Sequence, residues 1–134
     1  MGIAAGILDG AKMPSLKGPL MARGAREVAR LIRALSGNEL SAYGLCHLGD
    51  YETTLFSPHS NNRRYGEAIA TGERFEKLAE GVYTAKAMRL LAKKHGVEMP
   101  ITNAVYRVLY EDKDPKEEIL ALFERKTVTE FITK

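Results

Sequence analysis

The residues best suited to chemistry lie between His47 and Gly66, in the segment HLGDYETTLFSPHSNNRRYG. Asp50 offers a carboxylate that can assist a base or simply cap a turn. Ser60 opens the run SNNRR, whose small donors at the start of a helix can hold a phosphate through side chains, N–H groups and the helix dipole. The same residue types are ordinary helix N-caps. Three interpretations follow: a turn, a loop that grips RNA, or a pocket for a small phosphorylated molecule.

Thiol and imidazole groups near this segment make neither a convincing nucleophile nor a metal site. Cys46 is the single cysteine, and His47 and His59 are near it only in sequence. Three scattered histidines and one cysteine are a poor set of metal ligands. We expect Cys46 to be a small buried apolar residue rather than a nucleophile, with no disulfide and no metal site, in a reducing cytoplasmic setting.

Several segments show helical periodicity, so we expect helices to position the residues between His47 and Gly66. Between Pro19 and Leu35, apolar and arginine residues recur at spacings of three and four on opposite faces. The apolar face contains Met21, Ala25, Val28, Ile32 and Leu35, and the other face contains Arg23, Arg26, Arg30 and Arg33. The arginine face is interpreted as solvated, with phosphate binding as the less favoured alternative.

Further helices are expected over Tyr83–Gly96, which ends in basic residues and glycine, and over Pro100–Glu111. Another begins with Asp114 as its N-cap and Pro115 at its first position. Residues 38–49 and 63–72 resemble shorter helices ended by glycines, and residues 127–134 are expected to form a C-terminal tail. No βαβ pattern, glycine-rich nucleotide motif or repeat is present. The sequence therefore predicts one compact all-α domain over residues 1–134.

Composition narrows the class of protein. At 134 residues the chain has the length of one domain, and its net charge of +3 suits an anionic ligand without requiring nucleic acid. No segment approaches the roughly 20 apolar residues of a membrane span. The opening MGIAAGILDG lacks a basic region and reaches Asp9 early, so we expect no secretory signal.

Six segments together resemble the C-terminal domain of NAD(P)-dependent glycerol-3-phosphate dehydrogenase. In the family's order they are IAAGILDG (3–10), ARGAREVARLIRALSG (22–37), GLCHLGDYETT (44–54), SNNRRYGEAIATG (60–72), AEGVYTAKAM (79–88) and GVEMPITNAVYRVLYE (96–111). The resemblance implies the helical domain shared with 6-phosphogluconate dehydrogenases, which closes over a cofactor-binding Rossmann domain. It also implies conversion of glycerol 3-phosphate to dihydroxyacetone phosphate, with hydride passed to a nicotinamide.

The resemblance assigns roles to individual residues. Asp50 matches an active-site aspartate that assists the catalytic lysine and contacts substrate. The positions that match substrate-binding residues are Thr54, Ser60, Asn61 and Asn62. Leu78 and Glu80 match positions beside the cofactor. The resemblance implies no metal.

The chain departs from the family pattern at two points. Where the family has Ser-Arg-Asn-Arg-Arg, Asn61 replaces the first arginine, so we expect a weakened or retargeted phosphate site. Arg63 is the nearest substitute, but it leaves the helix in another direction. The family's catalytic lysine precedes IAAG, and a second lysine lies in the Rossmann domain; neither is in this chain.

These departures lead to the expectation of a substrate-type domain that is inactive alone. The chain is then a fragment of a larger enzyme, a subunit completed by a separate Rossmann-domain chain that carries NAD or NADP, or a stand-alone remnant. Its substrate would be a small phosphorylated molecule, and we expect no cofactor on the isolated chain. We expect a homodimer, formed over an apolar helix left exposed at the start of the chain. The alternative is a non-catalytic binding or scaffold module that keeps the fold. Nucleic-acid binding is less favoured because no aromatic residue is interleaved with the arginines.

Overall fold

The computed structural model describes residues 1–125, which contain seven α-helices and no strand. In chain order these are α1 (Gly2–Gly10), α2 (Lys17–Ala34), α3 (Asp50–Phe56), α4 (Asn61–Thr71), α5 (Gly81–His95), α6 (Pro100–Tyr110) and α7 (Pro115–Glu124). Short turns of 3-10 helix, η1 (Pro14–Leu16) and η2 (Glu39–Tyr43), and a π-helical turn, η3 (Leu45–Gly49), connect some of them. The all-α prediction is confirmed, while the tail expected at 127–134 lies outside the described residues.

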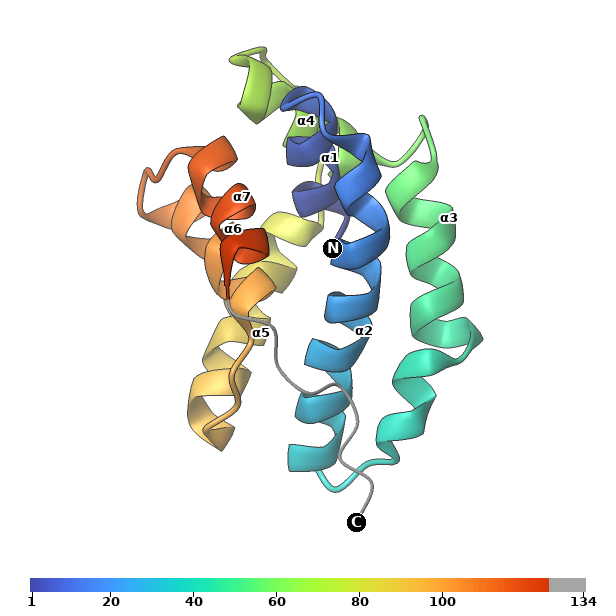
Figure 1. Cartoon of the computed structure of the whole chain (residues 1–134). Coiled ribbons are helices and arrows are strands. Elements are labelled where there is room, and N and C mark those ends of the chain that lie inside the picture. The colour runs from blue at the N-terminus through green and yellow to red at the C-terminus, as the bar shows by residue number, and fades with distance from the viewer. Residues whose placement is uncertain (126–134) are drawn as a thin grey trace.

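Helix α1 lies at the centre of the molecule, with α2 and α3 on one side and α5, α6 and α7 on the other (Figure 1). Every residue from Gly2 to Leu8 is buried. A helix that is apolar on all sides is stable only when other helices surround it. The expectation that a helix at the start of the chain is exposed is therefore wrong, and α1 offers no apolar face for a dimer to cover.

The predicted ends of four helices are confirmed. Gly72 and Gly96 follow α4 and α5 with φ of 79° and 64°, a left-handed conformation that favours glycine. The Asp114 side chain accepts a hydrogen bond from the Glu117 N–H at 2.8 Å at the start of α7. Pro100 and Pro115 occupy first helical positions, where the missing N–H costs nothing.

Helix α2 is present, and its buried face overlaps the predicted apolar face only in part. Ala25 of the predicted face is buried and Met21 packs against the core, but the buried positions also include Leu20, Gly24, Glu27 and Leu31. Leu35 lies just beyond the end of the helix and is 45% exposed. Apolar residues recur at helical spacing on two neighbouring faces of α2, so their periodicity alone does not decide which face is buried. The face that includes Glu27 can be buried because the Glu27 carboxylate accepts hydrogen bonds from donors on α6.

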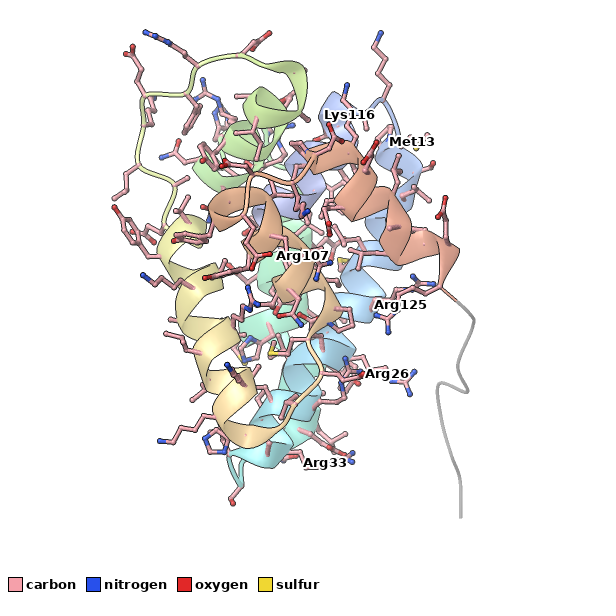
Figure 2. All side chains as sticks on the ribbon, turned by 90° about the vertical axis from the view of Figure 1, so that its left-hand side faces the viewer. Met13, Arg26, Arg33, Arg107, Lys116 and Arg125 are labelled. Carbon is pink, nitrogen blue, oxygen red and sulfur yellow. The ribbon has the colours of Figure 1, made fainter. Side chains whose placement is uncertain are left out.

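The arginines of α2 connect helices as well as facing solvent. Arg23 donates to the Leu122 carbonyl of α7, and Arg30 donates twice to the Glu98 carbonyl, at 2.9 and 3.1 Å. Arg33 pairs with Glu39 in the next turn. Figure 2 shows Arg26 and Arg33 along α2. These contacts explain part of the arginine pattern without an external phosphate.

Two local expectations in the middle of the chain are corrected. Residues 50–56, which sequence patterns did not mark as helical, form α3, so Asp50 is a first-turn helical residue rather than part of an open turn. Cys46, expected to be buried, is exposed, and its thiol lies 3.5 Å from the Ser41 carbonyl oxygen.

Helices α1 and α4 cross with their backbones in contact. A Cβ on Gly6 would overlap the carbonyl of Arg63, and a Cβ on Gly66 would overlap the carbonyl of Ile3. On the same face of α1, a Cβ on Gly10 would come within 2.7 Å of the Ala70 Cβ. Only glycine permits this approach, so these positions determine how closely the two helices pack.

We expect Gly6→Ala to destabilise the fold by at least about 3 kcal/mol, because the obstacle is backbone rather than a movable side chain. The matched control is Gly18→Ala in the first turn of α2, where nothing lies within 4 Å of the added carbon. That change should be neutral or stabilising by up to about 1 kcal/mol, since alanine favours helix. Urea unfolding midpoints measure both effects. Equal stability of the two variants would contradict the close crossing.

Candidate functional site

A cavity of about 280 Å³ is bounded by residues of α1, α2, α3, α5 and α6, with one residue from α4. Its polar lining includes Glu27, Asp50, Tyr51, Thr54, Asn62, Glu80, Thr84 and Thr102. Its apolar lining includes Ile3, Met88 and Val105. A concave site in which several polar side chains converge beside apolar ones is a candidate pocket for a small polar molecule.

Four of the seven residues predicted for the site line this cavity. Asp50 and Thr54 are separated by one turn and so share a face of α3. Asn62 comes from the first turn of α4, and Glu80 immediately precedes α5. These four residues, which span thirty-one positions of the chain, therefore line the same cavity.

The other three predicted residues do not line the cavity. Ser60 caps α4, where its hydroxyl accepts a hydrogen bond from the Arg63 N–H at 3.3 Å. Asn61 is exposed at the first position of α4, and Leu78 is 62% exposed in the segment before α5. Ser60 and Asn61 adjoin Asn62 in the chain, so they stand beside the cavity rather than in it.

The Asn62 side chain is held in place by a contact between two cavity walls. Its Oδ1 accepts a hydrogen bond from the Gly81 N–H at 2.9 Å. Gly81 is the first residue of α5, and it also lines the cavity. This bond satisfies a free donor at the start of α5 and fixes α4 relative to α5.

Glu27 is a functional candidate that the sequence analysis missed. Its carboxylate is buried, with the residue 3% exposed, and accepts hydrogen bonds from Ile101 N at 2.7 Å, Thr102 N at 2.9 Å and Thr102 Oγ1 at 2.6 Å. Burial raises the pKa of Glu27, and the hydrogen bonds from Thr102 and Ile101 offset part of that rise. In the segment GAREVA, Glu27 follows Arg26 directly and resembles half of an ordinary surface ion pair, so the sequence gives no clear signal of its burial.

Tyr51 adds a hydroxyl group to the same cavity. Burial raises its pKa to about 12, and the nearby carboxylates of Glu27 and Asp50 add to the rise. The phenol is therefore neutral at physiological pH and can donate a hydrogen bond to a ligand oxygen.

The charged side chains that line the cavity are all acidic, namely Glu27, Asp50 and Glu80, with no lysine, arginine or histidine side chain from residues 1–125. Met1 also lines the cavity; its amino group interacts with the Glu27 carboxylate, and burial lowers the pKa of this amino group. Three carboxylates suit ligand hydroxyl groups better than a phosphate. Within residues 1–125, no group of three histidine, cysteine or acidic residues could hold a metal ion.

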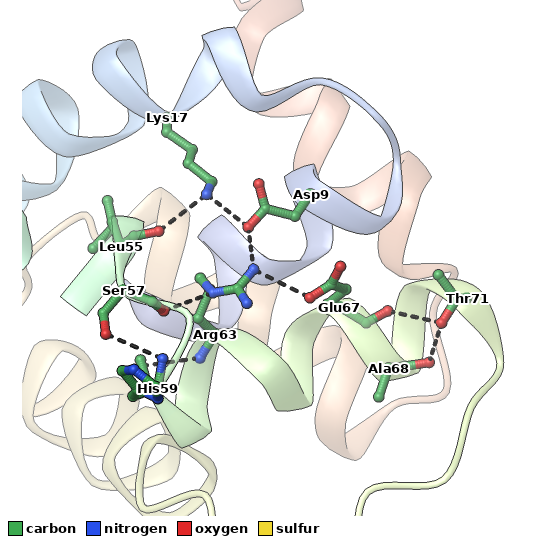
Figure 3. Close-up of polar contacts among 10 residues, drawn as sticks. Asp9, Lys17, Leu55, Ser57, His59, Arg63, Glu67, Ala68 and Thr71 are labelled. Carbon is green, nitrogen blue, oxygen red and sulfur yellow. Dashed lines mark hydrogen bonds and ion pairs between the residues drawn. The ribbon is translucent and has the colours of Figure 1, made fainter.

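The arginine nearest to Asn61 is committed to a structural contact. Arg63 Nη1 lies 2.6 Å from Asp9 Oδ2 and 3.1 Å from Glu67 Oε2, while its Nε donates to the Ser57 carbonyl at 2.8 Å (Figure 3). Its side chain is only 13% exposed. Arg63 thus cannot replace the missing arginine without breaking these contacts.

No helix in residues 1–125 is both long and apolar enough to cross a membrane.

Comparison with known proteins gives a consistent result. Residues 1–120 match the family described as NAD-dependent glycerol-3-phosphate dehydrogenase C-terminus. The chain is 42% identical to a glycerol-3-phosphate dehydrogenase [NAD(P)+] of Salinibacter ruber, over 93% of this chain and 39% of that protein. It is 40% identical to the enzyme of that name from Thermus thermophilus, over 94% of this chain and 41% of that protein. The chain therefore spans about two fifths of the length of these relatives.

A solved structure has the same fold. The crystal structure of glycerol-3-phosphate dehydrogenase from Coxiella burnetii superposes with a TM-score of 0.86 at 37% identity, covering 92% of this chain and 41% of that one. The helical arrangement of residues 1–125 is therefore that of one part of a longer protein.

We expect the free energy of unfolding to fall as pH rises from the ordinary glutamate pKa through the raised pKa of Glu27. In that range the folded chain holds a proton that the unfolded chain has released, so raising the pH favours unfolding. The difference in unfolding free energy between wild type and Glu27→Gln, measured by urea titration at successive pH values, isolates this effect. Glu124→Gln, an exposed carboxylate at the end of α7, should leave this pH dependence in place. A difference that grows in favour of wild type as pH rises would show that the sign is wrong.

Proposed function

Because the chain belongs to the family of C-terminal domains of NAD-dependent glycerol-3-phosphate dehydrogenase, we propose that it supplies the substrate-binding wall of such an enzyme. With a cofactor-binding Rossmann partner, that enzyme interconverts glycerol 3-phosphate and dihydroxyacetone phosphate. The observation that carries the proposal is the convergence of Asp50, Thr54, Asn62 and Glu80 on one cavity.

Each cavity residue has a role that its chemistry supports. Asp50 orients the base that takes the proton from the C2 hydroxyl, and Thr54 and Asn62 hold substrate oxygens. The neutral Tyr51 hydroxyl is a further donor to those oxygens. Glu27 stays behind them and holds the start of α6 against α2.

The residues present fit only one end of a nicotinamide cofactor. At about 280 Å³ the cavity accommodates a three-carbon substrate or a single ring, and a dinucleotide is much larger. Glu80, with Leu78 beside it, would contact the nicotinamide end, and the bound cofactor supplies the hydride acceptor. The rest of NAD or NADP requires the Rossmann partner, and so the isolated chain is proposed to be inactive.

The phosphate group is proposed to lie outside the cavity, at the first turn of α4. The acidic lining disfavours it inside, whereas Ser60 and Asn61 stand beside N–H groups at a helix N-terminus. Asn61 supplies no charge, and Arg63 is held by Asp9. Phosphate binding should therefore be weak.

That weakness favours a second candidate function. A chain whose phosphate site lacks its arginine can persist as a non-catalytic binding or scaffold module with the same fold. A homodimer and a cytoplasmic setting remain parts of the first proposal, although any dimer must use a surface other than α1.

We expect Asp50→Asn to lower NADH oxidation with dihydroxyacetone phosphate at least about ten-fold, because a neutral amide cannot assist the base. The assay uses the chain assembled with the cofactor-binding domain of a relative. Asp112→Asn is the matched control, since Asp112 is exposed and both residue types accept its φ of 51°. Equal rates for the two variants would remove Asp50 from the mechanism.

We expect Asn61→Arg to lower the KM for glycerol 3-phosphate about ten-fold or more, because a charge-assisted bond contributes about 1.5–3 kcal/mol. Ala121→Arg adds the same charge on the exposed surface of α7 and should leave KM unchanged. If neither wild type nor Asn61→Arg binds glycerol 3-phosphate by calorimetry, the scaffold function is the better one.

A further inference from the structure

Three charged side chains from three helices, one buried and two largely buried, meet at one oxygen atom. Lys17 Nζ and Arg63 Nη1 each lie 2.6 Å from Asp9 Oδ2 (Figure 3). The Lys17, Arg63 and Asp9 side chains are 6%, 13% and 14% exposed. Two cations that share one carboxylate oxygen fix the relative positions of α1, α2 and α4.

Both cations also donate hydrogen bonds to carbonyls at the C-terminal end of α3. Lys17 Nζ donates to the Leu55 carbonyl at 3.0 Å, and Arg63 Nε donates to the Ser57 carbonyl at 2.8 Å. These carbonyls are at the end of a helix, where no intrahelical partner is available. The charged group formed by Asp9, Lys17 and Arg63 therefore holds the end of α3 through two hydrogen bonds, one from α2 and one from α4.

The hydrogen bonds of the charged group involve the chain neighbours of two cavity residues. Leu55 follows Thr54, and Arg63 follows Asn62, in the chain. None of Asp9, Lys17 and Arg63 lines the cavity itself. The charged group is therefore bonded to α3 one residue after Thr54, and to α4 one residue after Asn62.

We propose that Asp9, Lys17 and Arg63 are positioning residues that set the separation of Thr54 and Asn62 across the cavity. The effect on turnover rests on the proposed function, whereas the effect on geometry does not. Stability alone does not require this design, because apolar residues of similar volume can replace buried ion pairs without loss. The two bonds to α3 carbonyls give the group its directional role.

Two variants weaken the hold on α3 in different ways. Arg63→Lys keeps a charge near Asp9, but its single nitrogen cannot also reach the Ser57 carbonyl from the position of Nε. Lys17→Met removes the donor to the Leu55 carbonyl and leaves Asp9 paired with Arg63. Glu67→Gln is the matched control, because the Glu67 side chain bonds Arg63 from a 44% exposed position and is not one of the two bonds to α3 carbonyls.

The first measurement is steady-state kinetics of the chain assembled with a cofactor-binding domain, at a temperature where circular dichroism shows every variant folded. We expect Arg63→Lys and Lys17→Met each to raise the KM for glycerol 3-phosphate roughly ten-fold, and Glu67→Gln to change it less than two-fold. Loss of folded protein lowers the apparent kcat but not the affinity of the remainder, so a purely structural role would leave KM unchanged.

The second measurement is independent of activity and uses the amide signal of Gly81 in the full chain. This N–H donates to Asn62 Oδ1, so displacement of Asn62 should move the amide proton upfield. The shift should appear in Arg63→Lys and Lys17→Met but not in Glu67→Gln. An unchanged Gly81 signal in both variants would overturn the positioning role, and so would an unchanged KM in an active enzyme. An inactive wild type would overturn the proposed function, and the Gly81 signal would still decide the positioning role.

Discussion

The glycine-lined crossing of α1 and α4 is the contact on which the rest of the structure depends. Because Gly6 and Gly66 carry no Cβ, the two backbones meet directly, and α1 becomes the central helix against which α2, α3, α6 and α7 also pack. The same crossing brings Asp9 within reach of Arg63 and sets Asn62 beside the start of α5. The packing of the core and the geometry of the candidate site therefore both depend on the α1–α4 pair, which has almost no side-chain volume between its backbones.

Two buried acidic residues show how this small core accommodates charge. Glu27 is compensated by donors at the start of α6, and Asp9 by two cations. No buried side-chain nitrogen or oxygen in residues 1–125 lacks a hydrogen-bond partner. Since an unpaired buried charge is costly, each of these carboxylates permits few arrangements of the helices around it. The first of these groups of contacts, around Glu27, lines the cavity itself.

Local patterns predicted most helices but not how they face one another. Capping residues and terminal glycines marked α4 to α7, because those signals act within one turn of the chain. Helix α1 has no amphipathic period, since it is buried on every side, and α3 is short and polar on the face toward the cavity. The burial of Glu27 on α2 was not predicted, because its hydrogen-bond partners are seventy-four and seventy-five residues away in sequence.

The sequence by itself determined the fold class, the family and four residues of the candidate site. These depend on local periodicity and on motifs that occur in a recognisable order. Only the tertiary structure decided that Asp50, Thr54, Asn62 and Glu80 share a cavity while Ser60, Asn61 and Leu78 stand outside it. It also decided that Glu27 lines the cavity and that Arg63 is bound to Asp9. The physical reason is that burial and charge pairing are properties of neighbours in space, which spacing along a chain does not specify.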